Sequence, residues 1–169
     1  LYFTHTYLKQ DSNGADYAGE FDTYQYGFNT GIKAYGADLT LFYAKTGSDA
    51  VFAPWGDGKV IIQQINAAGR GDEDAYAVRL NYDFGTLGAQ GLSAYVFYGV
   101  YDVDNVSANN VDITETDFNV QYAFSGFLEG LSIRGRYAIV DYDAGSADDY
   151  DDFRIYLRYD FSFSGKTDV

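Results

Sequence analysis

Hydrophobic and polar side chains alternate along residues 153–163. Every second position holds a large apolar or aromatic side chain, namely Phe153, Ile155, Leu157, Tyr159, Phe161 and Phe163. The positions between them are mostly polar and include Arg154 and Arg158. A period of two predicts a β-strand with one apolar face and one polar face. A soluble sheet protein would bury the apolar face, whereas a membrane barrel would turn it to lipid and turn the polar face to a lumen.

Similar segments, each of about the ten residues that a tilted strand needs to cross a bilayer, recur along the whole chain. They cover residues 1–9, 22–34, 37–46, 74–85, 91–102, 113–124, 131–142 and 152–163. No segment has a helical period, and the single proline, Pro54, lies outside all of them. The pattern therefore predicts an all-β fold of eight antiparallel, up-and-down strands. The two faces are ambiguous in the segments 1–9 and 91–102.

Short and long connections alternate between these segments. The short ones, near residues 34–37, 85–91 and 125–130, are rich in Gly and small side chains. The long ones, near residues 10–21, 46–73, 103–112 and 143–151, are rich in Asp, Asn, Ser and Gly. Outer-membrane barrels have tight periplasmic turns and long extracellular loops. This asymmetry favours a membrane barrel and predicts that both chain ends lie on its periplasmic side.

The composition agrees with a membrane barrel and excludes several other classes. Aromatic residues make up 19% of the chain, with 18 Tyr and 13 Phe, which suits strands bordered by aromatic girdles. The net charge of −14 argues against nucleic acid or an anionic membrane surface as a partner. The chain has no Cys and one histidine, His5, without a pattern for metal binding or catalysis. We therefore expect no enzymatic activity and no cofactor.

Basic residues gather on the polar faces of the predicted strands. They are Arg79, Arg134, Arg136, Arg154 and Arg158, with Lys33 as a possible sixth. An outward arginine near mid-bilayer costs about 2–4 kcal/mol, so we expect these side chains to point inward. They could then form a ladder that binds carboxylate-bearing solutes through charge-assisted hydrogen bonds. Alternatively, they pair with inward acids and only fill space, and the acids of suitable parity are Asp83, Glu115, Asp117 and Asp160.

The connection 46–73 is the longest and the least polar. It contains Phe52, Pro54 and Trp55, followed by Val60-Ile61-Ile62. Apolar groups of this kind suggest a loop that folds back into the barrel and narrows it, or one that packs on the rim or on a neighbouring subunit. Another connection carries the acidic cluster 148–152, which could bind Ca²⁺ but lacks EF-hand spacing. We favour a solvated loop there, and expect no metal site.

Several short motifs resemble the OprD family of outer-membrane porins, in particular their C-terminal portion. They are Gly27-Phe28-Asn29-Thr30-Gly31, Leu39-Thr40-Leu41-Phe42-Tyr43, Phe52-Ala53-Pro54-Trp55-Gly56, Asp72-Glu73-Asp74-Ala75-Tyr76 leading to Arg79 and Tyr82-Asp83-Phe84, and Gly91-Leu92-Ser93. The resemblance implies an eighteen-stranded barrel that passes small, often carboxylate-containing solutes past a row of basic residues. It also implies that the loop around Trp55 constricts the lumen. The terminal run 165–169 departs from the aromatic ending that is common in such barrels.

Together, these observations predict one β-barrel domain over residues 1–169, or the C-terminal portion of a larger one. Because the chain begins at Leu1, we expect a mature form or part of a longer protein. The predicted function is passive diffusion of small, carboxylate-bearing solutes through the bacterial outer membrane, by a monomer or homotrimer in contact with lipid and lipopolysaccharide. One alternative is a closed eight-stranded outer-membrane barrel with a structural or adhesive role and no pore. Another is a soluble ligand-binding barrel.

Overall fold

The computed structural model describes residues 1–12, 22–53, 58–104, 106, 110–143 and 148–161. These residues form eight strands and two short 3₁₀ helices. The strands are β1 (Tyr2–Asp11), β2 (Asp22–Ala34), β3 (Ala37–Thr46), β4 (Glu73–Asp83), β5 (Leu92–Val103), β6 (Ile113–Ala123), β7 (Leu131–Tyr142) and β8 (Tyr150–Tyr159). The 3₁₀ helices, η1 (Phe84–Leu87) and η2 (Gly126–Leu128), lie in two of the short connections. No helix in the described part of the chain is long and apolar enough to cross a membrane.

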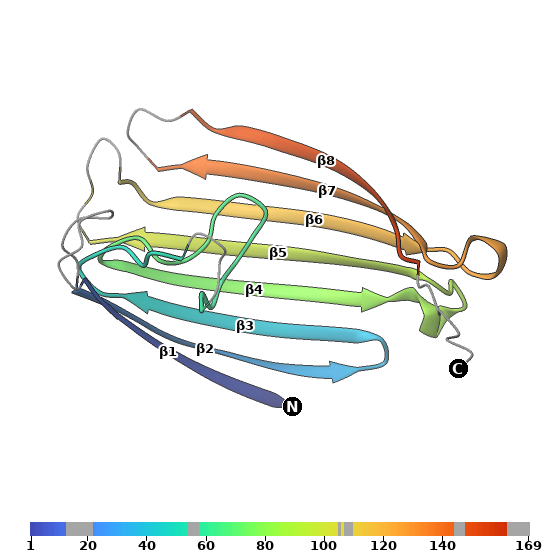
Figure 1. The fold of residues 1–169 in the computed structure, drawn as a ribbon, viewed down its shortest axis with the longest axis horizontal. Helices are drawn as coiled ribbons and strands as arrows, with labels where there is room; N and C mark the ends of the chain where they lie inside the picture. Colours follow the sequence, from blue (N-terminus) through green and yellow to red (C-terminus); the bar gives the residue numbers. More distant parts are fainter. Residues whose placement is uncertain (13–21, 54–57, 105, 107–109, 144–147, 162–169) are drawn as a thin grey trace, which may run out of the picture.

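The strands form one antiparallel sheet in which each strand pairs with its neighbours in sequence (Figure 1). The order β1 to β8 makes β1 and β8 the two edges, and no pairing among the described residues joins them. The predicted all-β, up-and-down fold is therefore confirmed. The alternative of a closed eight-stranded barrel is wrong for this structure, because closure requires the first and last strands to pair. The alternation of apolar and polar residues shows which face a side chain occupies, but it does not show whether the first and last strands pair.

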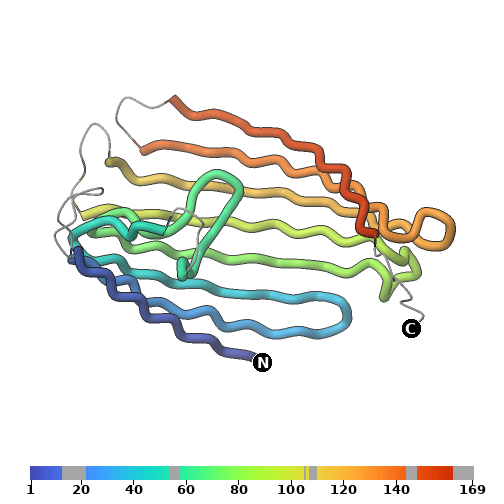
Figure 2. Tube along the Cα trace, in the orientation of Figure 1, coloured from blue at the N-terminus to red at the C-terminus, as the bar shows by residue number. Residues whose placement is uncertain are grey.

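The two faces of the sheet differ in what covers them. The connection between β3 and β4 lies over one face (Figures 1 and 2), which we call the inner face. Side chains directly opposite one another in the pairing share a face, and one such row runs from Arg79 through Phe97 and Asp117 to Asp152. This row lies on the inner face, since the connection contacts Asp117 and Asp152.

The opposite, outer face is apolar and uncovered. On β8, the exposed fractions are 66% for Phe153, 65% for Ile155 and 72% for Leu157. Large apolar side chains of the other strands are exposed in the same way, among them Leu41, Leu80, Val96, Phe118 and Val120. Soluble proteins rarely expose a contiguous apolar surface of this extent, whereas a sheet that faces lipid requires one. The outward direction of the aromatic and aliphatic row is as the period of two predicts.

The buried apolar core is small and lies between the inner face and the β3–β4 connection. Ile61 of this connection is fully buried together with Ala75, Phe97 and Tyr101 of the sheet. The ambiguous segment 91–102 is explained by this packing, since the inner face of β5 carries aromatic side chains that the connection covers. In β1, the register places Tyr2 and Thr4 on the inner face and His5, opposite Phe28, on the outer face.

Aromatic pairs mark the end of the sheet where the short connections lie. Tyr82 contacts Phe84 and Tyr122 contacts Phe124, each with ring centroids 4.9 Å apart. Aromatic pairs at the end of the strands are what a girdle at a membrane interface would contain. Strand bounds agree with the predicted segments within a few residues. The main difference is that β8 ends at Tyr159, with Phe163 outside the described residues.

Candidate functional site

All six predicted basic residues lie on the inner face. Arg136 lies directly opposite Arg154. Arg134 lies opposite Tyr156, two residues along β7 towards the end of the sheet that carries the short connections. The sheet brings the four arginines of β7 and β8 together, as consecutive antiparallel strands require. The other two lie apart from them, Arg79 at the middle of β4 and Lys33 near the end of β2.

Four of the six basic residues form ion pairs with inner-face carboxylates. The N–O distances are 3.2 Å for Lys33–Asp38, 3.5 Å for Arg136–Asp117, 2.6 Å for Arg154–Asp152 and 2.8 Å for Arg158–Asp160. The last pair is solvated, with the Arg158 side chain 74% exposed. The pairs with Lys33, Arg154 and Arg158 are partly or largely exposed and individually weak. The Arg136–Asp117 pair differs, because Asp117 is fully buried.

Arg79 and Arg134 form no ion pair within the described part of the chain. The guanidinium of Arg79 lies between two aromatic rings, 5.4 Å from the centroid of Phe42 and 5.5 Å from that of Phe97. Such contacts orient a guanidinium without neutralising it. The Arg79 Nε is buried and has no hydrogen-bond partner among the residues that the structure describes.

Arg134 is held by neutral groups. Its Nε donates to the Asn119 side-chain oxygen, its Nη2 donates to the Tyr95 hydroxyl at 3.3 Å, and its guanidinium lies 6.0 Å from the Tyr156 ring centroid. It also lines a cavity of about 280 Å³ together with Tyr156 and Arg158. Two positive side chains and one aromatic ring therefore face a space large enough for a small anion.

The acids predicted to neutralise the arginines are only partly used in that way. The predictions for Asp117 and Asp160 are confirmed. Those for Asp83 and Glu115 are wrong: Asp83 accepts a hydrogen bond from the Gly85 backbone at the start of η1, and Glu115 binds the β3–β4 connection. The actual partners Asp38 and Asp152 were missed, although both have inward parity.

The β3–β4 connection covers the middle of the inner face through residues 60–68, and the predicted Phe52 lies nearer the edge of the sheet. Hydrogen bonds between the Phe52 backbone and the Gln10 side chain hold Phe52 beside the end of β1, where the residue is 59% exposed. Pro54 and Trp55 lie outside the described residues. Residues 61–68 form a narrow turn, with a bridge between Ile62 and Ala67 and a bond from the Gln63 N–H to the Asn66 carbonyl at 2.8 Å.

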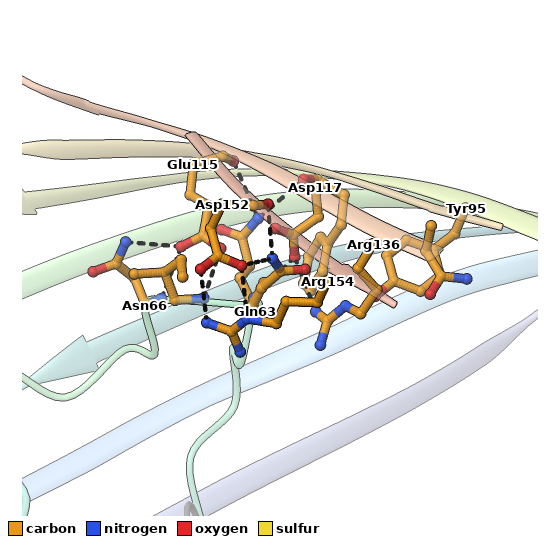
Figure 3. Close-up of polar contacts among 12 residues, drawn as sticks. Gln63, Asn66, Tyr95, Glu115, Asp117, Arg136, Asp152 and Arg154 are labelled. Atoms are coloured by element: carbon orange, nitrogen blue, oxygen red, sulfur yellow. Dashed lines mark hydrogen bonds and ion pairs between the residues drawn. The ribbon is translucent and has the colours of Figure 1, made fainter. Parts of the chain in front are cut away.

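The tip of this turn, residues 63–66, is bound to the inner face by polar contacts (Figure 3). Gln63 donates to the Phe97 carbonyl at 2.9 Å and accepts from the Tyr101 hydroxyl at 2.9 Å. Gln64 donates from its backbone to Asp117 at 3.0 Å and from its side chain to Asp152. Glu115 and Asp117, two acids of inward parity on a single strand, are a sequence signal for these contacts, but parity alone predicts that they pair with arginines.

Arg70 fixes the returning end of the connection and was also missed. Its Nε pairs with the fully buried Glu73, while its Nη1 and Nη2 donate to the carbonyls of Val111 at 2.6 Å and Tyr101 at 2.9 Å. Arg70 lies in a predicted loop, where periodicity says nothing about side-chain direction.

The acidic cluster near β8 does not converge on one point. Asp149 accepts from the Tyr142 backbone at 2.8 Å, Asp151 accepts from the Tyr137 hydroxyl, and Asp152 pairs with Arg154. Among the residues that the structure describes, no group of three or more acidic or histidine side chains could hold a metal ion.

Comparison with known proteins identifies the family. The family description "outer membrane porin, OprD family" matches residues 1–163. The chain belongs to the OprD family of outer-membrane porins. Its place is therefore the bacterial outer membrane, and the family is one of channels rather than enzymes. None of the curated proteins matches the chain.

Solved porins of the OprD family share its fold. OccK3 (OpdO) of Pseudomonas aeruginosa is 26% identical, with a TM-score of 0.78 over 90% of this chain and 42% of that one. A BenF-like porin from Pseudomonas fluorescens Pf-5 is 19% identical, with a TM-score of 0.84 over 93% and 42%. OpdK of P. aeruginosa, solved with vanillate, is 23% identical, with a TM-score of 0.76 over 93% and 48%. The chain thus spans about half or less of the length of these porins.

Proposed function

We propose that this OprD-family chain forms part of the wall of a passive channel whose arginines favour small, carboxylate-bearing solutes. The observation that carries the proposal is that Arg79 and Arg134 face inward and form no ion pair with a carboxylate in the described residues. A solute carboxylate would supply the missing acceptor through bidentate, charge-assisted hydrogen bonds.

The surroundings of these two arginines favour solutes that also carry a ring. Tyr156 lies beside Arg134 in the 280 Å³ cavity, and the partly buried Phe42 lies beside Arg79. Aromatic rings offer stacking surface next to each guanidinium. The OpdK structure was solved with vanillate, an aromatic carboxylate, which agrees with this preference.

We further propose that residues 60–66 narrow the channel, because Val60, Ile61 and the tip of the turn cover the inner face. The arginine pair Arg136 and Arg154 then lies at the edge of this narrow part, since Gln64 shares a carboxylate with each of them. Solutes would have to pass close to the arginines in order to pass the turn.

Ion selectivity in planar bilayers tests the proposal. Under a salt gradient, the reversal potential of the reconstituted protein should indicate anion preference, and Arg79→Gln and Arg134→Gln should each reduce it. Lys9→Gln is the matched control, because it removes the same charge from the outer face of β1, where Lys9 pairs with Asp11. Equal reversal potentials for wild type, Arg79→Gln and Arg134→Gln would refute a role for these arginines in solute selection.

A further inference from the structure

Two fully buried carboxylates hold the tip of the β3–β4 turn. Glu115 and Asp117 lie two residues apart on the inner face of β6, and both are 0% exposed. Glu115 accepts from the backbone N–H groups of Ile65 at 2.9 Å and Asn66 at 2.7 Å, and from the Asn66 side chain at 2.7 Å. Asp117 accepts from the Gln64 backbone at 3.0 Å.

Loss of these hydrogen bonds would destabilise the folded protein. A buried carboxylate must be compensated by hydrogen-bond donors or by a positive charge. The charge of Glu115 is met by donors of the turn, with no cation within ion-pair distance in the described residues. The turn therefore supplies the donors that allow Glu115 to be buried, and Glu115 gives the turn its attachment.

Gln63 adds an attachment that depends on a glycine. Its amide nitrogen donates to the carbonyls of Phe97 at 2.9 Å and Glu115 at 3.1 Å, and its oxygen accepts from the Tyr101 hydroxyl. The amide lies directly over Gly99, where a Cβ would be 2.0 Å from the Gln63 oxygen. The absence of a side chain at Gly99 thus allows the Gln63 amide to lie close to the backbone of β5.

The same carboxylate cluster reaches the arginines (Figure 3). Asp117 is shared between the Gln64 backbone and Arg136, and Asp152 between the Gln64 side chain and Arg154. Within the described part of the chain, buried side-chain atoms of Gln64, Asp117 and Arg136 at this junction lack a hydrogen-bond partner. The contacts of Asp117 are therefore less complete than those of Glu115, which makes Glu115 the firmer of the two attachments.

The geometry points to Glu115 and Asp117 as a carboxylate latch that keeps residues 63–66 across the inner face and so sets the free width of the lumen. Both are positioning residues, which act through the turn and not by contact with solute. The effect on width rests on the proposed channel function, whereas the attachment of the turn does not.

A single introduced thiol reports the position of the turn, because the native chain has no cysteine. Ile61 is 0% exposed against the sheet, so Ile61→Cys should react slowly with a water-soluble thiol reagent. Glu115→Gln in the same background should accelerate the reaction by about tenfold or more, since several charge-assisted bonds are weakened at once. Single-channel conductance of Glu115→Gln should rise above that of the wild type.

Two further variants keep the test decisive. Glu129→Gln removes the same charge from an exposed turn far from residues 63–66 and should change neither quantity. Asn66→Ala removes one donor to Glu115 without removing a charge, and should give a smaller change in the same direction. Heat-modifiable migration on gels checks that each variant is folded, and Asn66→Ala carries the test if Glu115→Gln does not fold.

The outcomes separate the latch from the channel. Unchanged protection of Ile61→Cys in both Glu115→Gln and Asn66→Ala would overturn the latch. Faster modification with unchanged conductance would overturn its control of the width. If the wild type forms no channel in bilayers, the proposed function fails, and the thiol reaction rates still decide whether Glu115 and Asp117 hold the turn.

Discussion

Arg136 and Arg154 lie directly opposite each other on β7 and β8, and each is paired with a different carboxylate. Like charges directly opposite in a sheet repel one another. Here Asp117 and Asp152 offset that repulsion, and both also bind Gln64 of the inward turn. The charge balance of the arginine pair and the position of the turn are consequently connected through these two acids.

Removal of one of these acids should unbalance the pair. Asp152→Asn leaves Arg154 without its carboxylate and should increase anion preference, measured as a shift of reversal potential in a salt gradient. Because the Arg154–Asp152 pair is partly exposed, the loss in stability should be no more than about 1 kcal/mol. Asp160→Asn, at the solvated pair with Arg158, should shift the potential less. A shift towards cation preference in Asp152→Asn would contradict this account.

Arg79 should act through its shape as well as its charge. Arg79→Lys keeps a positive charge but loses the planar group that lies between Phe42 and Phe97. We expect nearly unchanged ion selectivity for small ions and weaker block of the current by an aromatic carboxylate such as benzoate. Current block measured against benzoate concentration checks this, with acetate as the ring-free comparison. Equal loss of block for both anions would argue against a stacking role.

The close approach at Gly99 gives a third prediction. Gly99→Ala should displace Gln63 and increase the reactivity of Ile61→Cys, because the added methyl group overlaps the Gln63 amide. Gly135→Ala on β7 is the matched control, since no atom of the described residues lies within 4 Å of a Cβ there. Thiol modification rates of the two variants should therefore differ, and equal rates would mean that Gln63 contributes little to the attachment.

Lipid contact of the outer face can be tested by stability. Leu80→Arg places a guanidinium on the outer face of β4 and should destabilise the folded protein by about 2–4 kcal/mol in lipid, as for other arginines near mid-bilayer. Asn81→Arg, one residue further on the inner face, should cost much less. Urea titrations of both variants in lipid vesicles measure the difference. A larger cost for Asn81→Arg would reverse the assignment of the faces.

The strands and their faces follow from the sequence because membrane barrels impose a strict period of two. Arg136 and Leu157 could be assigned to opposite faces from parity alone, and the register agrees. Parity fails on the inner face of β5, where Phe97 and Tyr101 look like outward residues until Ile61 is seen to cover them. An aromatic side chain can face lipid or pack against a turn. The period of two therefore cannot distinguish a lipid-facing aromatic residue from one that the turn covers.

The partners of the charged residues were less predictable. The role of Glu115 depends on where Ile65 and Asn66 lie, and these residues sit in a long connection without periodicity. Similarly, Asp38 and Asp152 reach their basic partners through side-chain directions that parity restricts but does not select. The site therefore depends on where the β3–β4 connection lies, and the alternating pattern of the strands does not predict its position.

The central claim is that the two faces of the sheet meet different media, with lipid outside and water inside. Val120 is exposed on the outer face of β6, whereas its neighbour Gln121 lines the 280 Å³ cavity beside Arg134 on the inner face. In lipid vesicles, a water-soluble thiol reagent should modify Gln121→Cys and leave Val120→Cys unmodified. Modification of Val120→Cys with protection of Gln121→Cys would contradict the assignment of the faces and the proposals that depend on it.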